Sequence, residues 1–282
     1  MVSRIPITVV IISKDEEAGI LATLDHVRDF DQVIVVDSRS ADRTVEIAEA
    51  WGATVVPFDW DGRYPKKKQW GIERAGAIHD WILLLDADEL VTPELAAELR
   101  ARSAELDAGT YGAYDIRLRY KFAGRFLDHG HTVIKRALVD RRVTRFLDVE
   151  EIGWDYEVEG HIQPQSERPI GRLTARIEHD DRDPVDSWFT RHNKYSRWEA
   201  ELMADRDEFR EVAARRTAQG KVWARVPFKP LVFFLYSYVV RAGFLDGRAG
   251  FDYAIALSMY YWQIGLKLRE RSRTPRPEAV AA

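Results

Sequence analysis

Over the first hundred residues, the hydrophobic pattern switches between the period of a buried strand and that of a helix. Residues 7–13 (ITVVIIS) and 32–38 (QVIVVDS) are β-branched and apolar on both faces, as in a parallel sheet covered by helices. We expect an edge strand at 54–58, because Pro57 cannot donate to a ladder, and a fourth strand at 81–88. Helical spacing predicts helices at 20–27, at 45–51 with Gly52 ending it, and at 65–78, and Thr92 followed by Pro93 is expected to cap the next helix. This alternation predicts an α/β fold with a doubly wound sheet.

The rest of the chain follows other patterns. Residues 111–122 alternate as a longer strand, and a charged helix is expected around 184–209. Residues 227–240 and 251–268 are strongly apolar and aromatic, but charged residues interrupt them and each falls short of the ~20 apolar residues that cross a bilayer. They are either core helices of a second domain or helices that lie in a membrane interface.

Composition narrows the class of protein. With 282 residues, 46% of them hydrophobic, the chain can form one large domain or two smaller ones. The absence of cysteine favours a reducing compartment such as the cytosol. Residues 5–12 are apolar but meet the charged residues 14–17 without a cleavage site, which predicts a strand and not a signal peptide. A net charge of -4 argues against nucleic acid as the main partner, although basic residues cluster at 63–74 and 206–229.

Polar residues gather at three strand ends. Residues 13–17, 37–40 and 86–89 each follow a predicted buried strand, and the carboxyl ends of parallel strands meet at one edge of the sheet. In the last of these, three carboxylates crowd within four residues and raise one another's pKa, so a cation is expected among them. Asp-x-Asp suits Mg²⁺ or Mn²⁺ that phosphate oxygens also hold, although two acids after a strand can equally form a loop or a helix cap. The pattern favours a metal and a nucleotide diphosphate.

Several motifs in order resemble family 2 glycosyltransferases of the GT-A fold. They are ITVVIISKDEE, QVIVVDSRSADRTVEIAEAWGATV, KKKQWGIERA and WILLLDADE, all within the first hundred residues. Within that family the chain looks most like the bacterial branch that includes lipopolysaccharide core glucosyltransferases, and RHNKYSRWEAELM and FLDGRAGFDYAIALSMYY extend the likeness to most of the chain. The resemblance implies a GT-A fold, with a Rossmann-like nucleotide-binding sheet and flanking helices. The apolar segments 227–240 and 251–268 would then form a C-terminal helical extension that associates with a membrane.

The resemblance also implies roles at the donor site. Asp37 would read the nucleobase, although it could also cap the helix that follows. Asp86 would face the ribose and the metal, and Asp88 would bind the Mn²⁺ or Mg²⁺ that bridges the diphosphate. Lys67 and Lys68 would face the nucleotide sugar, where cations stabilise the charge of a departing diphosphate. Including Asp15, where the family usually has Asn, the implied nucleotide-binding residues are Ser13, Asp15, Glu16, Asp37, Ser38, Lys67, Lys68, Asp86 and Ala87.

The general base is expected in a segment whose sequence differs from that of the relatives. They place it in a short Val-His-Glu segment, whereas residues 154–164 read WDYEVEGHIQP, so Glu159 and Gly160 stand in place of His and Glu. We expect Glu159 to be the base, with Glu157 and His161 as alternatives. The other interpretation is that these alternating acids are solvent-facing positions of a strand.

Three further residues are candidates for the site. Trp154 and Tyr156 could stack on an acceptor sugar, or they could be ordinary packing residues. His179 follows a strand-like stretch, and the resemblance makes it a candidate metal ligand, with a structural, hydrogen-bonded histidine as the alternative.

The function implied is inverting transfer of a sugar from a nucleotide diphosphate sugar, with UDP favoured, to a hydroxyl of a lipid-linked or lipopolysaccharide-type glycan. We expect the enzyme to lie peripherally on the cytoplasmic face of the cell membrane. Residues 1–122 would bind the nucleotide sugar, 123–220 would bind the acceptor and supply the base, 221–271 would form apolar aromatic helices at the membrane surface, and 272–282 would be a flexible tail.

Two other functions compete with this one. A non-catalytic relative that only binds nucleotide sugar would account for the altered base segment. A sugar nucleotidyltransferase also pairs an α/β sheet with acidic metal ligands, but it needs a Gly-rich first loop, and the loop here is SKDEEAG.

Overall fold

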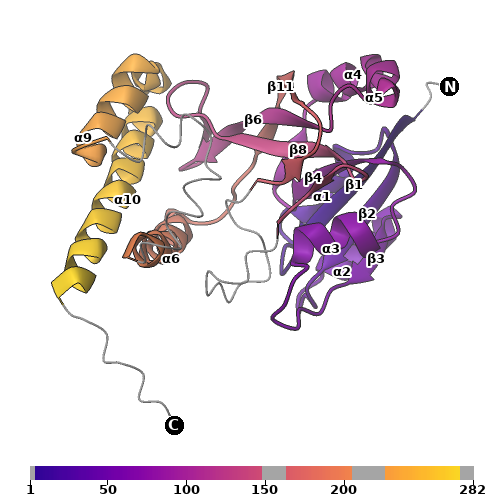
Figure 1. Cartoon of the computed structure of the whole chain (residues 1–282), viewed down its shortest axis with the longest axis horizontal. Helices are drawn as coiled ribbons and strands as arrows, with labels where there is room; N and C mark the ends of the chain where they lie inside the picture. Colours follow the sequence, from indigo (N-terminus) through magenta and orange to yellow (C-terminus); the bar gives the residue numbers. More distant parts are fainter. Residues whose placement is uncertain (1–3, 148–162, 205–225, 274–282) are drawn as a thin grey trace, which may run out of the picture. The chain divides into compact units, whose positions relative to one another are not determined.

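A computed structural model describes residues 4–147, 163–204 and 226–273 of the chain (Figure 1). The described residues fall into two compact units. Unit 1 comprises residues up to 121 together with 132–182, and unit 2 comprises 122–131 together with residues from 183 onward. The division by role made from the sequence stays a prediction.

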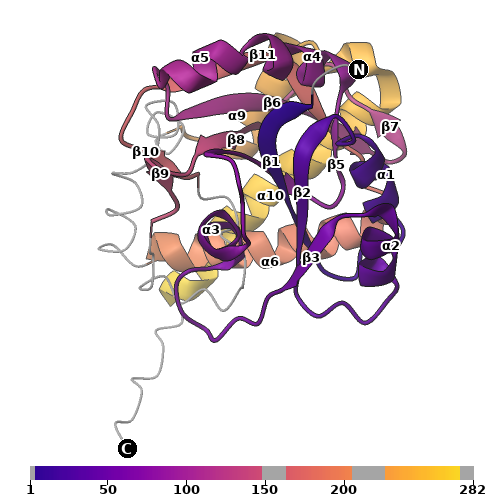
Figure 2. The ribbon, with the colours of Figure 1, turned by 90° about the vertical axis from the view of Figure 1, so that its right-hand side faces the viewer.

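The parallel part of the sheet in unit 1 matches the predicted strands. Its order is β3 (Thr54–Pro57), β2 (Phe30–Asp37), β1 (Ile5–Ser13) and β4 (Trp81–Asp86), with β3 at the edge as Pro57 indicated (Figure 2). In the register of these strands, Ser13 lies opposite Asp37, and Ile12 lies opposite Asp86. The polar strand ends therefore align at one edge, as the sequence predicted.

Beyond β4 the sheet is mixed. Strand β8 (Ile134–Asp140) runs antiparallel to β4, and β6 (Ala113–Phe122), the longer strand predicted at 111–122, runs antiparallel to β8. Strand β11 (Ile170–His179) is parallel to β6, and β5 (Glu89–Val91) closes the order antiparallel to β11. Short strands occur at β7 (Arg125–Phe126), β9 (Thr144–Arg145) and β10 (Gln165–Ser166), the last two paired with each other.

Helices cover both faces of the parallel strands. They are α1 (Ile20–Asp25), α2 (Thr44–Trp51), α3 (Lys67–Arg74), α4 (Pro93–Ala101) and α5 (Ser103–Ala108). Thr92 caps α4 by accepting a hydrogen bond from the Leu95 amide, as predicted. The predicted helix at 65–78 was too long: the backbone at Lys66 is still extended, and Gly76 adopts a positive φ of 86° that a right-handed helix does not have.

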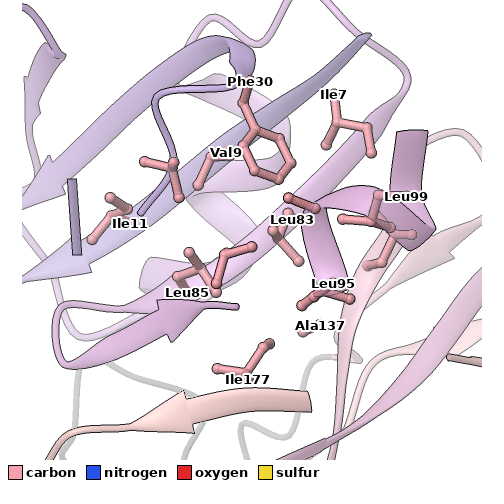
Figure 3. Packing of buried hydrophobic residues seen from close by; sticks show 14 of the residues in the cluster. Ile7, Val9, Ile11, Phe30, Leu83, Leu85, Leu95, Leu99, Ala137 and Ile177 are labelled. Atoms are coloured by element: carbon pink, nitrogen blue, oxygen red, sulfur yellow. The ribbon is translucent and has the colours of Figure 1, made fainter. Parts of the chain in front are cut away.

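The core explains why the strand pattern was easy to interpret. Side chains of β1 point alternately to the two faces. Ile7, Val9 and Ile11 pack with α1, α2 and α4 in one cluster (Figure 3), whereas Val10 and Ile12 pack with α3 in the other. A Cβ on Gly71 of α3 would lie 3.0 Å from Val10 Cγ1, so the absence of a side chain there lets α3 approach the sheet closely. This approach brings the first turn of α3 to the end of β1.

Unit 2 is helical. It contains α6 (Val185–Ala204), α9 (Lys229–Phe234), the π-helical turn η2 (Leu235–Val240), the 3₁₀ turn η3 (Gly243–Asp246) and α10 (Gly247–Arg273). Helices α6 and α9 both pack on α10 (Figure 1), and Phe122, Trp188, Phe233 and Tyr253 are among the residues of their core. Residues 241–250, which lie between the two apolar segments of the sequence, contribute η3 and the first turn of α10. Among the described helices none has the length and apolarity to cross a membrane.

His131 of unit 2 gives a testable pH dependence. Its ring packs edge-on against Phe233, and burial, with the charge of Arg241 nearby, lowers the pKa of His131 from 6.5 to about 4. Because the unfolded chain then binds the proton first, the free energy of unfolding should fall by on the order of 3 kcal/mol as the pH drops through this interval, and below it this group has no further effect. Urea unfolding at stepped pH should show this component in the wild type and not in His131→Leu. The same slope in both proteins would contradict the assignment.

Candidate active site

A hydrogen-bond network joins the ends of β1 and β2. Asp37 is 2% exposed, and its Oδ1 accepts hydrogen bonds from Ser13 Oγ at 2.9 Å and Ser40 Oγ at 2.5 Å. Asp37 Oδ2 accepts the Ser40 amide at 2.8 Å, and the Ser38 amide donates to the Ser13 carbonyl. The next helix begins only at Thr44, so Asp37 organises this turn and does not cap the helix, as the alternative interpretation had it.

The loop that follows β1 is hydrogen-bonded to the segment that follows β2. Asp15 has a φ of 55°, its amide donates to Ser40 Oγ, and its Oδ1 accepts the Ala41 amide at 2.7 Å. The Glu16 amide donates to Thr44 Oγ1 at 2.7 Å. Asp15 is thus engaged by backbone contacts, and the nucleotide binding that the resemblance implies for Asp15 and Glu16 stays a prediction.

The two lysines of α3 lie at the sheet edge, nearly buried. Lys67 Nζ donates to the Ser13 carbonyl at 2.6 Å, at 2% exposure. Lys68 Nζ lies 3.1 Å from Asp86 Oδ1. Both cations therefore stand where the ends of β1 and β4 meet, the place at which the sequence predicted a nucleotide sugar.

Asp86 is the centre of a buried charge cluster. Its Oδ2 accepts from Lys135 Nζ at 3.1 Å, and the same ammonium group pairs with Glu89 Oε2. Glu89, 1% exposed, also accepts the Asp86 amide at 2.8 Å. Burial alone would raise the pKa of Asp86, but Lys135 and Lys68 outweigh it and hold that pKa well below its ordinary value. Lysine side chains thus supply positive charge among these carboxylates at Asp86 and Glu89, and the predicted role of Asp86 as a metal ligand stays a prediction.

Asp88 stands apart from the lysine pairs. Its carbonyl accepts the Asp180 amide at 2.8 Å, and its Oδ2 lies 3.3 Å from Nε2 of His179, whose ring stacks on Tyr120. Burial raises the pKa of Asp88, and His179 opposes the rise. Burial disfavours the charged form of this carboxyl group, and a divalent cation bound beside it would stabilise that charged form.

The donor set at this point suits the metal expected from the sequence. Asp88 and His179 bring one carboxylate and one imidazole together, and their side chains are 28% and 17% exposed, so a ligand can reach them. In the part of the chain that the structure describes, no group of three or more His, Asp and Glu side chains could hold a metal ion. Mg²⁺ and Mn²⁺ that also bind a diphosphate need only one or two protein ligands, so this pair fits such an ion.

Comparison with known proteins decides the family. The model of glycosyl transferase family 2 matches residues 8–152, which include the ends of β1, β2 and β4 and make up just over half of the chain. The chain belongs to glycosyl transferase family 2. Its mixed sheet is that of a GT-A-like α/β fold, and the family predicted from the sequence is confirmed.

Individual relatives of this family 2 glycosyltransferase match it either over part of its length or at low sequence identity. An uncharacterized glycosyltransferase of Rickettsia typhi is 37% identical over 119 residues, 42% of this chain, and the chain spans only 40% of that protein's length. The lipopolysaccharide core biosynthesis glycosyltransferase LpsC of Rhizobium meliloti is 22% identical over 96% of this chain and 94% of its own. Glucosyl-3-phosphoglycerate synthase of Mycobacterium tuberculosis, solved with Mn²⁺ and UDP, is 24% identical over 41% of this chain and 44% of its own, with a TM-score of 0.32.

Of the remaining predicted residues of the family 2 site, one is described by the structure and five are not. Ala87 is buried, and its carbonyl accepts the Thr23 hydroxyl at 2.5 Å, which fixes the Asp-x-Asp turn to α1. The proposed base and acceptor residues all lie in 148–162, outside the described residues, and their roles stay predictions; they are Glu159, Glu157, His161, Trp154 and Tyr156.

Sequence reasoning missed Lys135. The residue follows Asp86 by 49 positions and reaches it only through the pairing of β8 with β4. A signal was present, because Lys135 shares its strand with the fully buried Ala137, Leu138 and Val139. A lysine in such a strand requires a buried acid as partner.

Proposed function

We propose that this family 2 glycosyltransferase moves a sugar, with inversion, from a UDP-sugar to a hydroxyl of a lipid-linked or lipopolysaccharide-type glycan. The observation that carries the proposal is the division of the acids at the end of β4: lysines neutralise Asp86 and Glu89, while Asp88 faces His179. A site so arranged can accept a metal-bound diphosphate without losing its internal charge balance.

The chain's own residues would act in three ways. Asp37, already fixed by Ser13 and Ser40, would accept a hydrogen bond from the nucleobase. The ammonium groups of Lys68 and Lys135 would stabilise the negative charge that grows on the departing diphosphate. Mn²⁺ or Mg²⁺ held by Asp88 and His179, with Asp86 facing the ribose, would supply Lewis-acid stabilisation of that leaving group. Glu159 would take the proton from the attacking hydroxyl.

The role proposed for Asp37 predicts a binding defect. Asp37→Ala should weaken UDP binding by about 10- to 100-fold, because a hydrogen bond to a charged group contributes about 1.5–3 kcal/mol. Calorimetry with UDP and Mn²⁺ measures the change. Asp31→Ala, at the opposite end of the same strand and with a side chain 44% exposed, is the matched control and should bind normally. Unchanged affinity in an Asp37→Ala protein that still unfolds cooperatively would refute the role.

The acceptor is proposed to be a membrane lipid-linked glycan at the cytoplasmic face of the cell membrane. Two observations support this: the likeness over nearly the whole chain to LpsC, whose name assigns it to lipopolysaccharide core biosynthesis, and the many exposed apolar side chains in unit 2. The donor sugar and the acceptor hydroxyl would be set by residues outside the ends of β1, β2 and β4.

Turnover tests the proposal against its alternatives. Purified protein would be incubated with Mn²⁺, a panel of nucleotide sugars and a bacterial lipid extract, and nucleoside diphosphate release would be measured together with the anomeric configuration of the product. Release of UDP from one sugar donor with inversion is expected. Pyrophosphate release from a nucleoside triphosphate and a sugar phosphate would identify a nucleotidyltransferase, and nucleotide binding without turnover on any acceptor would identify a non-catalytic relative.

A further inference from the structure

The outer face of α10 exposes apolar side chains that a water-facing helix would not carry. Phe251, Ile255, Met259, Trp262 and Leu266 are 36%, 38%, 43%, 50% and 43% exposed. Their spacing of three and four residues places them on one side of the helix, within a sector of about 80°. The opposite side is the one that packs in unit 2, through residues such as Tyr253, Leu257 and Ile264.

Arginines continue this row at both ends. At about 100° per residue, Arg248 before Phe251 and Arg269 and Arg273 after Leu266 fall in the same sector of the helix. Arg248 is 84% exposed, pairs with Asp252 at the edge of the row and lies over the ring of Phe251. We call the eight residues the outer row of α10: Arg248, Phe251, Ile255, Met259, Trp262, Leu266, Arg269 and Arg273.

Aromatic contacts join the outer row to a second exposed apolar surface. The ring of Phe251 contacts Phe234 and Tyr238, at centroid distances of 5.9 and 5.5 Å, and Tyr238 contacts Phe244 at 6.3 Å. Around these rings α9, η2 and η3 expose further large apolar side chains, namely Leu231, Leu235, Tyr236, Val239, Val240 and Leu245. The rings of Phe234, Tyr238 and Phe244 therefore connect the outer row of α10 to the exposed apolar side chains of α9, η2 and η3.

Charge is distributed to match an anionic surface. Residues 226–273 contain seven Lys and Arg against three Asp and Glu, a net of +4, whereas the whole chain carries -4. No described helix is long and apolar enough to span a bilayer. A helix surface that combines apolar and aromatic side chains with basic ones is instead typical of a helix that lies in a membrane interface.

We infer that the outer row of α10, with the adjoining surface of α9, η2 and η3, docks on an anionic lipid bilayer and lies parallel to its plane. The inference deepens the membrane location proposed above by naming the surface and the lipid class. A second copy of the chain fits less well: pairing two outer rows, parallel or antiparallel, sets the terminal arginines of one copy against those of the other. Lipid phosphates instead give each of them an anionic partner.

A single introduced thiol tests the docking directly, because the chain has no cysteine. Met259→Cys would be labelled with a polarity-sensitive fluorophore and mixed with vesicles of equal parts phosphatidylcholine and phosphatidylglycerol. We expect the emission to rise at least about twofold and shift to the blue as the label enters the interface. Ile78→Cys, an exposed apolar position in unit 1, is the matched control and should not respond. No response at Met259, or equal responses at both positions, would overturn the inference.

Substitutions separate the apolar contribution from the charged one. The pair Ile255→Glu and Trp262→Glu should reduce vesicle binding by about tenfold or more, whereas Leu21→Glu with Ile78→Glu, an equal charge change on exposed apolar residues of unit 1, should not. Arg269→Gln with Arg273→Gln should lower, by about tenfold, the ratio of binding to vesicles that contain phosphatidylglycerol over binding to pure phosphatidylcholine vesicles.

The outcome is independent of the catalytic proposal. Vesicle binding is measured without nucleotide, and UDP binding of the Glu variants is measured without vesicles, so loss of one function does not imply loss of the other. If sedimentation shows wild-type dimers that the Ile255→Glu, Trp262→Glu protein cannot form, while vesicle binding is unchanged, the outer row is a contact between copies and the inference is wrong.

Discussion

Replacing Asp88 with Asn is expected to lower kcat/KM by about 1000-fold. The carboxylate that faces His179 carries the charge a divalent cation requires, and the amide does not. Losing several kcal/mol of charge stabilisation on the leaving diphosphate corresponds to this factor, since about 1.4 kcal/mol is tenfold in rate. Steady-state kinetics over a Mn²⁺ titration measure the loss.

Asp88→Asn should not harm the fold. The hydrogen bond from Asp180 uses the backbone carbonyl of Asp88, and burial raises the pKa of this side chain, so its charged form is disfavoured in the folded protein. The unfolding temperature should therefore stay equal to that of the wild type or rise. Asp107→Asn, an exposed acid on α5, is the control and should keep full activity. Wild-type metal dependence in Asp88→Asn would show that the site has been misplaced.

Replacing Lys135 with Met is expected to cost about 3 kcal/mol of stability. The side chain of Lys135 is 12% exposed and that of Glu89 only 1%, so removing the ammonium group leaves a carboxylate buried without its counter-charge. The free energy of unfolding from urea titration measures the cost. Lys194→Met, an exposed lysine on α6, should change stability little.

A double variant distinguishes a charge effect from a packing effect. If the cost arises from the unpaired carboxylate, adding Glu89→Gln to Lys135→Met should restore part of the stability, because the neutral amide is less costly to bury. A double variant no more stable than Lys135→Met, or a loss below about 1 kcal/mol in the single variant, would contradict the charge explanation.

The strands could be predicted because a strand buried on both faces is a run of consecutive apolar residues. Val9, Val10 and Ile11 are apolar on both faces since helices cover both sides of β1, and the polar residue that ends each strand marks the sheet edge. Helix ends were also predictable where one residue decides them, as at Thr92 and Gly52. The helix at 65–78 was overestimated because its apolar spacing continues past Gly76, where the backbone no longer does.

The charge balance of the site could not be predicted in the same way. The residue pattern alone does not distinguish Asp86 from Asp88, and a metal with a nucleotide diphosphate was expected to balance the charge of the whole cluster. Only the pairing of β8 with β4 brings Lys135 to Asp86 and Glu89, and only β11 brings His179 to Asp88. Two acids two residues apart thus have different partners, and the difference depends on contacts that are distant along the chain.

The most direct test of the central claim is the thermal stability of the purified protein with UDP, GDP, TDP and CDP, each with and without Mn²⁺. A ligand that binds only the folded state raises the unfolding temperature. We predict a shift with UDP that requires Mn²⁺, is smaller with the other diphosphates, and is absent in Asp88→Asn. No shift with any diphosphate, or an equal shift with and without Mn²⁺, would contradict a metal and nucleotide site at the end of β4.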